Sequence, residues 1–545
     1  MQKFIEYFKE LSPQYRFLKK QRAEWGTRID KYRDMSDAAQ LFDLKKASAN
    51  VDVVEDDTWS DLDMDQVFQR IDACITPLGR QYLYNKLRTL GADPQQLKID
   101  YQSAMALKDD TCRREKIQLI LAALKHPDAS KVTELLFDEP PKVYFPRGAA
   151  ITLAGMVPLT GVLVAFSLIP VWSPAIFILA NFFFSQYYFH AIERYSNGFM
   201  YLKYLLGSAK KLSIIDTKET TANKINAIEN LKKFGPTLKR LTKKSRSAGI
   251  NAGSAGVNVD GTLAYFLNLL CLMDFLVFIK SKKLVEQHKF EFAQIFNEVA
   301  SLDAAISIAS YSCQIDTYCN PSFGEAGAMA FQDLMHPLLD DAVPNSFSTN
   351  SRSALITGSN MAGKTTFIKT VGVNLILAQT LWLCLAESAC IPLGPVYSSI
   401  KRADSLQDGK SYYWREIEAL LAFVKTSSNR KRPVFLIDEI LRGTNTIERL
   451  AASTAILEVL SGAGIVLVTT HDLELSELLS APFDLYHFQE STDLHNMFDY
   501  KIRDGKVTSR NAISLLEQIG FPTEIVQRAR DVAKALSSGE ARLSH

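Results

Sequence analysis

The stretch "LITGSNMAGKTTFIKTV", Leu355–Val371, contains a complete phosphate-binding signature and decides the fold of the C-terminal part of the chain. Gly358, Gly363, Lys364 and Thr365 satisfy the spacing GxxxxGK[ST]. The apolar run before the loop predicts a buried strand, and "TTFIKTVGVNLILAQ" after it predicts a helix. This context is the one that such a loop requires, so we expect a parallel α/β domain here.

The loop also predicts which residues hold a nucleotide. Its glycines let backbone N–H groups turn toward phosphate oxygens, Lys364 is expected to pair with the β- and γ-phosphates, and the Thr365 hydroxyl is the expected Mg²⁺ ligand. The residues expected to bind ATP are Gly358, Ser359, Asn360, Met361, Ala362, Gly363, Lys364, Thr365 and Thr366.

Two further apolar runs deliver polar side chains at their ends. "PVFLID" ends at Asp438, which is expected to bind Mg²⁺, and Glu439 beside it is well placed to orient or deprotonate the attacking water. Taken alone, Glu439 is equally well explained as a helix-cap charge. "GIVLVTT" ends just before His471, a candidate contact to the γ-phosphate. Because parallel strands present their carboxyl ends at one edge, we predict a catalytic group of Lys364, Glu439 and His471 there.

Composition sets wider limits on the rest of the chain. Its 545 residues exceed what one hydrophobic core supports, so several domains are expected. The net charge of +2 creates no global basic field, and any nucleic-acid contact must come from a local patch. The seven cysteines are scattered without a CxxC pair, which argues against a zinc site and against a disulfide framework.

An uncharged run lies between Arg147 and Glu193. Its first half matches the roughly 20 apolar residues that span a bilayer, "PVWSP" predicts a turn, and the second half ends near Tyr187 and Tyr188. We expect a transmembrane helical hairpin over residues 148–190, with basic flanks on the cytoplasmic side; the alternative is a hairpin buried in a large core. A second apolar run, 262–279, contains Asp274, and its embedding in a membrane is left open.

The stretch "LKKFGPTLKRLTKKSRS" carries seven Lys or Arg residues from Lys232 to Arg246. This basic run is a candidate contact to the phosphates of DNA. Anionic lipid is an equally good partner for the same charges, so both interpretations stay open.

Several of these motifs together resemble the MutS proteins, mismatch-repair members of the ABC-type ATPases. The resemblance is carried by "TGSNMAGKTT", "DEILRGTNT" and "TTHDLEL" in this order, by "HPLL" and "VPNSFS" upstream, by "GKSYYWREIEAL", and by "GFPTEIVQRARDVAKAL". More loosely, "IDACITPLGRQYL" resembles the start of the family's helical core.

The resemblance implies a dimer with composite ATP sites. In such a dimer, Ser411 would approach the γ-phosphate bound by the neighbouring subunit. The loop Arg442–Thr446 would lie at the interface between the two subunits. Thr365 in place of the family's Ser keeps a hydroxyl ligand. Glu448-Arg449 stands in place of the family's usual Asp-Gly and is a departure from its pattern.

The expected architecture is a multidomain chain in which an all-α core and lever region with a transmembrane hairpin precedes an α/β P-loop ATPase domain of the ABC type. The expected parts are an N-terminal helical arm (1–57), a MutS-like helical core (58–147), the hairpin (148–190), a helical lever (191–317), and the ATPase domain with a C-terminal helix-turn-helix (318–545).

The resemblance implies a DNA-binding ATPase that clamps DNA as a dimer, in mismatch repair or a related DNA transaction. The 57 residues before the core leave no room for the family's mismatch-recognition domain, so no mismatch recognition of its own is expected. The expected location is the inner (cytoplasmic) membrane with the ATPase domain facing the cytoplasm. The alternative is an ABC-type ATPase that drives a membrane assembly without a DNA role.

Overall fold

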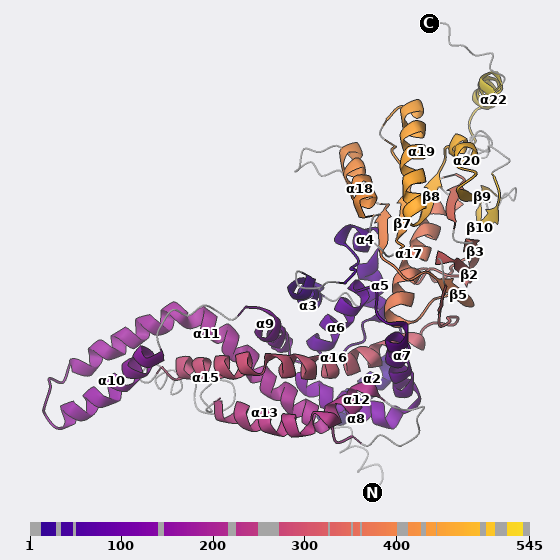
Figure 1. Cartoon of the computed structure of the whole chain (residues 1–545). Coiled ribbons are helices and arrows are strands. Elements are labelled where there is room, and N and C mark those ends of the chain that lie inside the picture. The colour runs from indigo at the N-terminus through magenta and orange to yellow at the C-terminus, as the bar shows by residue number, and fades with distance from the viewer. Residues whose placement is uncertain are drawn as a thin grey trace. The chain divides into compact units, whose positions relative to one another are not determined.

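The computed structural model describes residues 12–28, 34–46, 51–139, 147–215, 225–248, 272–324, 327–349, 352–359, 362–400, 412–426, 432–442, 444–490, 498–506 and 520–537 (Figure 1). The chain forms two compact units. Unit 1 comprises residues 1–50, 68–88 and 95–316, and unit 2 comprises residues 51–67, 89–94 and 317–545.

Unit 1 is helical. Its elements are α2 (Pro13–Glu24), α3 (Ser36–Lys46), α6 (Pro77–Arg88), α7 (Pro94–Asp109), α8 (Thr111–Leu121), η1 (Ala122–Leu124), η2 (Pro127–Ser130), α9 (Lys131–Phe137), α10 (Arg147–Ala165), α11 (Ser173–Leu212), α12 (Asn226–Lys233), α13 (Gly235–Ala248), α15 (Met273–Gln287) and α16 (Lys289–Ser312); α5 (Met64–Ile71) is shared with unit 2. Helix α16 runs through the core of this unit, with Phe292, Phe296 and Ala300 fully buried along one stripe.

The transmembrane hairpin predicted for residues 148–190 is wrong. Within the described ranges, no helix is both long enough and apolar enough to cross a membrane. Helix α11 instead continues for 40 residues and buries Phe199, Leu202 and Leu206 in the core of unit 1, while α10 packs against α11 and α15 (Figure 1). The prediction of a membrane hairpin used only the length of the uncharged run and took no account of the helices against which its residues pack. The predicted inner-membrane location rested on the same run and is wrong with it.

The turn between α10 and α11 remains apolar at its surface. Phe166, Val171 and Trp172 are each more than half exposed. Of the second apolar run, residues 262–271 lie outside the described residues. Its remainder enters α15, where Phe275 and Phe278 are buried.

Unit 2 is built on two sheets. Its elements are α4 (Asp56–Asp61), β1 (Ser322–Phe323), β2 (Met329–Leu334), β3 (Asn345–Thr349), β4 (Ser353–Thr357), α17 (Lys364–Leu381), β5 (Ser388–Ile391), β6 (Val396–Ser399), α18 (Tyr412–Thr426), β7 (Val434–Asp438), α19 (Thr446–Ala463), β8 (Ile465–Thr470), α20 (Leu473–Leu478), β9 (Phe483–Glu490), β10 (Phe498–Asp504) and α22 (Thr523–Ser537).

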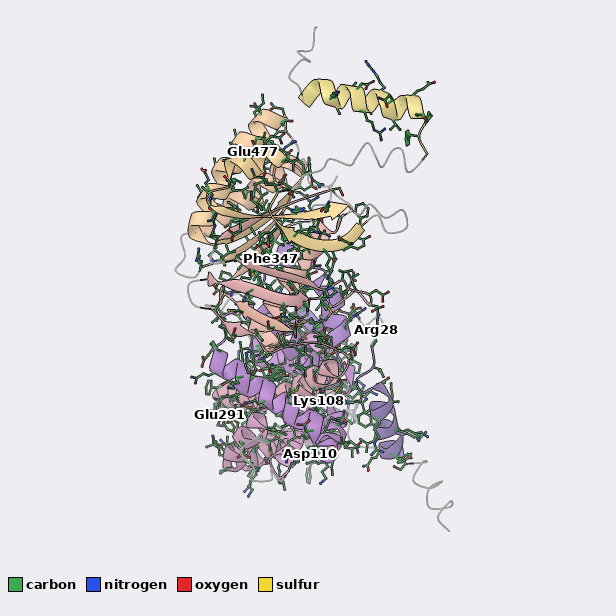
Figure 2. The ribbon with its side chains drawn as sticks, turned by 90° about the vertical axis from the view of Figure 1, so that its right-hand side faces the viewer. Arg28, Lys108, Asp110, Glu291, Phe347 and Glu477 are labelled. Atoms are coloured by element: carbon green, nitrogen blue, oxygen red, sulfur yellow. The ribbon has the colours of Figure 1, made fainter. Side chains whose placement is uncertain are left out.

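The larger sheet has the order β10-β9-β4-β8-β7-β6 and is parallel except for β10. Strands β4, β7 and β8 correspond to the three apolar runs of the sequence, and each is almost wholly buried because helices cover the sheet. The smaller sheet has the order β1-β5-β2-β3. Phe347 of β3 packs on Phe367 of α17 and Tyr486 of β9, so its ring joins the two sheets (Figure 2).

A short helix far away in sequence protects the edge of the larger sheet. Strand β6 forms one edge of this sheet, and α4 lies against it. The Asp61 carboxylate accepts hydrogen bonds from Ser398 Oγ (2.7 Å) and the Ile400 N–H (2.8 Å), and Thr58 Oγ1 accepts one from the Ser398 N–H (3.0 Å). These bonds satisfy edge donors that would otherwise offer pairing to another strand.

Candidate nucleotide site

The predicted phosphate-binding loop joins β4 to α17. Gly358 and Gly363 have φ of +138° and +98°, conformations that favour glycine, and Gly363 is the N-cap of α17. A Cβ on Gly358 would lie 2.7 Å from the carbonyl oxygen of Phe488, so a larger residue would collide with β9. Asn360 and Met361 lie outside the described residues.

Lys364 is buried and turned back on its own loop. Its Nζ donates hydrogen bonds to the carbonyl oxygens of Gly358 (2.6 Å) and Ser359 (2.9 Å). Burial lowers the pKa of the Lys364 ammonium, and the nearby carboxylates of Glu439 and Asp438 oppose this shift. An anion bound in the loop would therefore compensate the positive charge of the buried Lys364 ammonium, which donates hydrogen bonds to carbonyl groups in this structure.

Ser359 Oγ is a second sign that the loop suits an anion. This hydroxyl is buried, and it has no hydrogen-bond partner among the described residues. A buried hydroxyl without a partner costs about 1–3 kcal/mol, and a phosphate oxygen would satisfy it.

The two predicted metal ligands lie together. Thr365 Oγ1, in the first turn of α17, donates to Asp438 Oδ2 at the end of β7 over 2.8 Å. Mg²⁺ holds an octahedron of oxygens at 2.0–2.1 Å, so adjacent ligand oxygens lie about 2.9 Å apart. The pair therefore fits two neighbouring ligands of one Mg²⁺ ion. Thr469 Oγ1 of β8 donates to the other carboxylate oxygen and orients Asp438.

Glu439 follows directly and is almost fully buried, with 4% of its surface exposed. Its carboxylate contacts His471 Nδ1 at 3.1 Å and forms an ion pair with Arg442. Its φ of +55° is strained for a residue with a side chain, and the hydrogen bond from its N–H to Thr469 O (3.0 Å) holds it there. Glu439 is thus no helix-cap charge, since it is buried at the strand end beside the predicted metal ligands.

A cavity of about 190 Å³ adjoins the loop, and sequence reasoning missed it. The loop side contributes Gly363, Thr366 and Phe367, and the segment between β2 and β3 contributes residues that include Leu339 and Val343. The motifs "HPLL" and "VPNSFS" bracket that segment and were the available signal. A nucleotide with its phosphates in the loop would have this cavity within reach for its base or ribose.

The predicted interface residues are only partly visible. Ser411 and Gly443 lie outside the described residues. In the loop Arg442–Thr446, Asn445 caps α19 by accepting a hydrogen bond from the Glu448 N–H (3.0 Å). Arg449, which departs from the family pattern, forms two hydrogen bonds to Asp472 (2.8 and 2.9 Å) beside His471.

The predicted basic run covers the end of α12 and most of α13 in unit 1. Leu231, Leu238 and Leu241 face the core, which turns the basic residues outward. Exposed cations are Lys233, Lys239, Arg240, Lys243 and Lys244, and α15, which packs beside α13, adds exposed Lys280 and Lys283; the side chain of Arg246 lies outside the described residues.

A strand, a glycine-rich loop and a helix that begins at the loop lysine, with acidic residues at the ends of neighbouring parallel strands, define a P-loop nucleotide-binding domain. Residues 354–537 match the family model of MutS domain V. The domain that carries the site is therefore similar to domain V of the MutS family.

Curated relatives show the same similarity. The DNA mismatch repair protein MutS of Solibacter usitatus is 30% identical over 253 residues, which cover 43% of this chain and 29% of that protein. The protein of the same name from Geobacillus thermodenitrificans is 30% identical over 289 residues (50% and 31%), and that of one Thermus thermophilus strain is 29% identical over 246 residues (44% and 30%). The chain thus spans about a third of the length of these relatives.

Proposed function

We propose that unit 2 binds ATP with Mg²⁺ and hydrolyses it, and that the chain uses this cycle as a DNA-binding dimer in mismatch repair or a related DNA transaction. The convergence of Lys364, the Thr365–Asp438 pair and the Glu439–His471 pair at one edge of the sheet carries the enzymatic part. The names of the relatives support the DNA part.

Each residue has a role in this proposal. Lys364 leaves the loop carbonyls and pairs with phosphate oxygens, while Thr365 and Asp438 hold Mg²⁺, which neutralises phosphate charge when bound. Glu439 orients the attacking water and accepts its proton. Because Arg442 and His471 now hold the Glu439 carboxylate, that contact has to loosen before Glu439 can receive a water.

The enzymatic proposal is tested by separating binding from hydrolysis. Lys364→Ala should weaken ATP binding at least tenfold, because a charge-assisted hydrogen bond contributes about 1.5–3 kcal/mol. Glu439→Gln should leave binding nearly unchanged and lower turnover about 10²–10⁴-fold, the usual contribution of a general base. Binding is measured with a fluorescent ATP analogue, and turnover by phosphate release.

Exposed residues of unit 2 supply matched controls. Glu477 of α20 is exposed (Figure 2), and Lys506 after β10 is exposed as well. Glu477→Gln and Lys506→Ala should leave both binding and turnover at the level of the unchanged protein. Full turnover in Glu439→Gln would remove Glu439 from its role, and unchanged ATP affinity in Lys364→Ala would remove the loop as the binding site.

The DNA-binding part rests on the outward face of α13. Phosphate contacts by exposed lysines supply affinity without sequence information. The direct test is ATP turnover with and without homoduplex, mismatched and branched DNA. A rate that no DNA changes would argue against coupling of the two activities.

A further inference from the structure

Two cysteines of unit 2 face each other across an isolated antiparallel bridge. The Cys319 N–H donates to Cys384 O (2.8 Å), and the Cys384 N–H donates to Cys319 O (3.0 Å). Residues that exchange both hydrogen bonds in this way are direct cross-strand partners, and their side chains lie on the same side of the bridge.

Neighbouring side chains fix this register. Asn320 Nδ2 donates to Trp382 O (2.9 Å), and Trp382 Nε1 donates to Pro321 O (3.0 Å). Together with the two bonds of the bridge, they hold the segment before β1 against the segment that follows α17. Cys319 and Cys384 are therefore held opposite each other in the folded unit.

The spacing of such a pair suits a disulfide bond. Hydrogen-bonded antiparallel partners have Cα atoms about 5.5 Å apart, inside the range of about 4.4–6.8 Å found for disulfides. In hydrogen-bonded pairs the Cβ atoms lie toward the upper end of about 4.5–5.5 Å, so they have to approach by about 1 Å to reach the 3.5–4.5 Å of a disulfide. A bond that requires such an approach carries some strain and is readily reduced again.

The two thiols have different environments. Cys384 is fully buried, with its Sγ 3.5 Å from Asn374 Oδ1 of α17, whereas Cys319 is partly exposed. A hydrogen bond between the thiols lowers the pKa of Cys319 and raises the pKa of Cys384. Cys319 is thus the accessible thiol that ionises first, and Cys384 is the protected one.

We propose that Cys319 and Cys384 form a reversible dithiol–disulfide site that takes low-molecular-weight disulfides such as glutathione disulfide as oxidants. The Cys319 thiolate attacks one sulfur of glutathione disulfide and releases one glutathione thiolate. Cys384 then loses its proton and attacks the Cys319 sulfur, which releases the second glutathione. Two protein thiols are oxidised, and one glutathione disulfide is reduced to two glutathione thiolates, which take up the two protons lost by Cys319 and Cys384.

The test uses the full folded chain in buffers of varied ratio of reduced to oxidised glutathione. After the thiols are blocked with N-ethylmaleimide, cleavage on the carboxyl side of Asp and Glu separates Cys319 from Cys313 at Asp316, and Cys384 from Cys390 at Glu387. Mass spectrometry then measures the linked peptide. We expect the Cys319–Cys384 link to dominate over all other cysteine pairs and to disappear in excess reduced glutathione.

Variants and a denatured sample complete the design. Cys319→Ser should abolish the link and leave Cys384 blocked by N-ethylmaleimide, while Cys390→Ser should leave the link unchanged. In denaturant the preference for this pair should be lost. Recovery of Cys319 as a stable glutathione adduct with Cys384 still free, or equal yields of other pairs in the folded chain, would overturn the proposal.

Discussion

Two residues beside the nucleotide site adopt backbone conformations that side chains disfavour. Glu439 and Leu441 have φ of +55° and +57°, which costs about 1–3 kcal/mol each. Hydrogen bonds compensate this strain: the Glu439 N–H donates to Thr469 O, and the Leu441 N–H donates to Glu416 Oε1 (2.5 Å). The strain therefore lies at the strand end where Glu439 meets His471, beside the candidate nucleotide site.

Arg449 and Asp472 form an ion pair beside His471. The sequence alone did not predict this pair. Their two hydrogen bonds join α19 to the end of β8, and both side chains are mostly buried. Removal of the cation would leave a buried carboxylate without its main partner, so Arg449→Met should lower the free energy of unfolding by about 3 kcal/mol. A double-mutant cycle with Asp472→Asn, measured by denaturant titration, should give a coupling energy of about 1–3 kcal/mol.

The matched control for this pair is the exposed Arg503–Asp499 pair of β10. Exposed pairs contribute only about 0–1 kcal/mol, so Arg503→Met should have little effect. Equal losses for the two arginine variants would show that Arg449 contributes no more than an ordinary surface charge.

At the level of elements, α6 begins at Pro77, inside the stretch "TPLG". The turn before it is fixed by Asp303 of α16. This buried carboxylate accepts hydrogen bonds from the N–H groups of Ile75 (3.0 Å) and Thr76 (2.7 Å) and from Thr76 Oγ1 (2.7 Å). Burial raises the pKa of Asp303 to about 6, and the three donors oppose that shift.

Gly79 of α6 permits this close packing. A Cβ added there would lie 2.3 Å from Asp303 Oδ2 and 2.6 Å from its Cβ. Gly79→Ala should therefore lower the free energy of unfolding by about 1–3 kcal/mol, the usual cost of overpacking. Gly207 of α11 is the control, because a Cβ there meets nothing within 4 Å, and Gly207→Ala should be neutral or stabilise by up to about 1 kcal/mol. A Gly79→Ala protein as stable as Gly207→Ala would contradict the described packing.

Helix α13 carries the prediction for DNA. Lys239 and Lys243 lie one turn apart on its exposed face. If both bind phosphates, changing both to Gln should reduce the slope of log affinity against log salt by about 1.8, or about 0.9 for each phosphate that is no longer neutralised. The effect should be the same for a matched duplex and for one with a G·T pair, because phosphate contacts carry no sequence information.

Lys116 and Lys125, exposed on other elements of unit 1, provide the control. The double Gln variant at these two positions removes the same charge and should leave the salt slope unchanged. An equal change in both double variants would assign the effect to overall charge and not to α13.

At the level of the whole molecule, sequence patterns within a few neighbouring residues predicted the local parts of the nucleotide site. The loop, the strands ending at Asp438 and before His471, and the meeting of their side chains followed from apolar runs and from the geometry of parallel sheets. The prediction that residues 148–190 cross a membrane was wrong, because the length of an apolar run and its lack of charge do not show what the run packs against. Residues 51–67 fold with unit 2 through Asp61 and Thr58, which lie 337 and 340 residues before Ser398, and no local pattern encodes such a contact.

The dimer stays a prediction of the family resemblance. If the ATP sites are composite, each one combines Lys364 of one subunit with Ser411 of the other, although Ser411 lies outside the described residues. In a two-fold symmetric dimer the same contact is made twice, so each subunit gives its loop to one site and its serine to the other. This arrangement can be tested without any knowledge of the interface.

Lys364→Ala and Ser411→Ala should each lower turnover when pure, and a mixture of the two proteins should regain part of it. In a mixed dimer, one composite site contains both substitutions, and the other contains neither. With random exchange of subunits, half of the dimers are mixed and each has one intact site, so about a quarter of the normal site number returns. If Ser411 acts within its own subunit, every site in every dimer keeps one substitution, and mixing restores nothing. Phosphate release after equilibration of the mixture distinguishes the two arrangements. A mixture of Lys364→Ala with Glu477→Gln should keep half of the normal rate in either arrangement, and it controls for loss of activity on mixing.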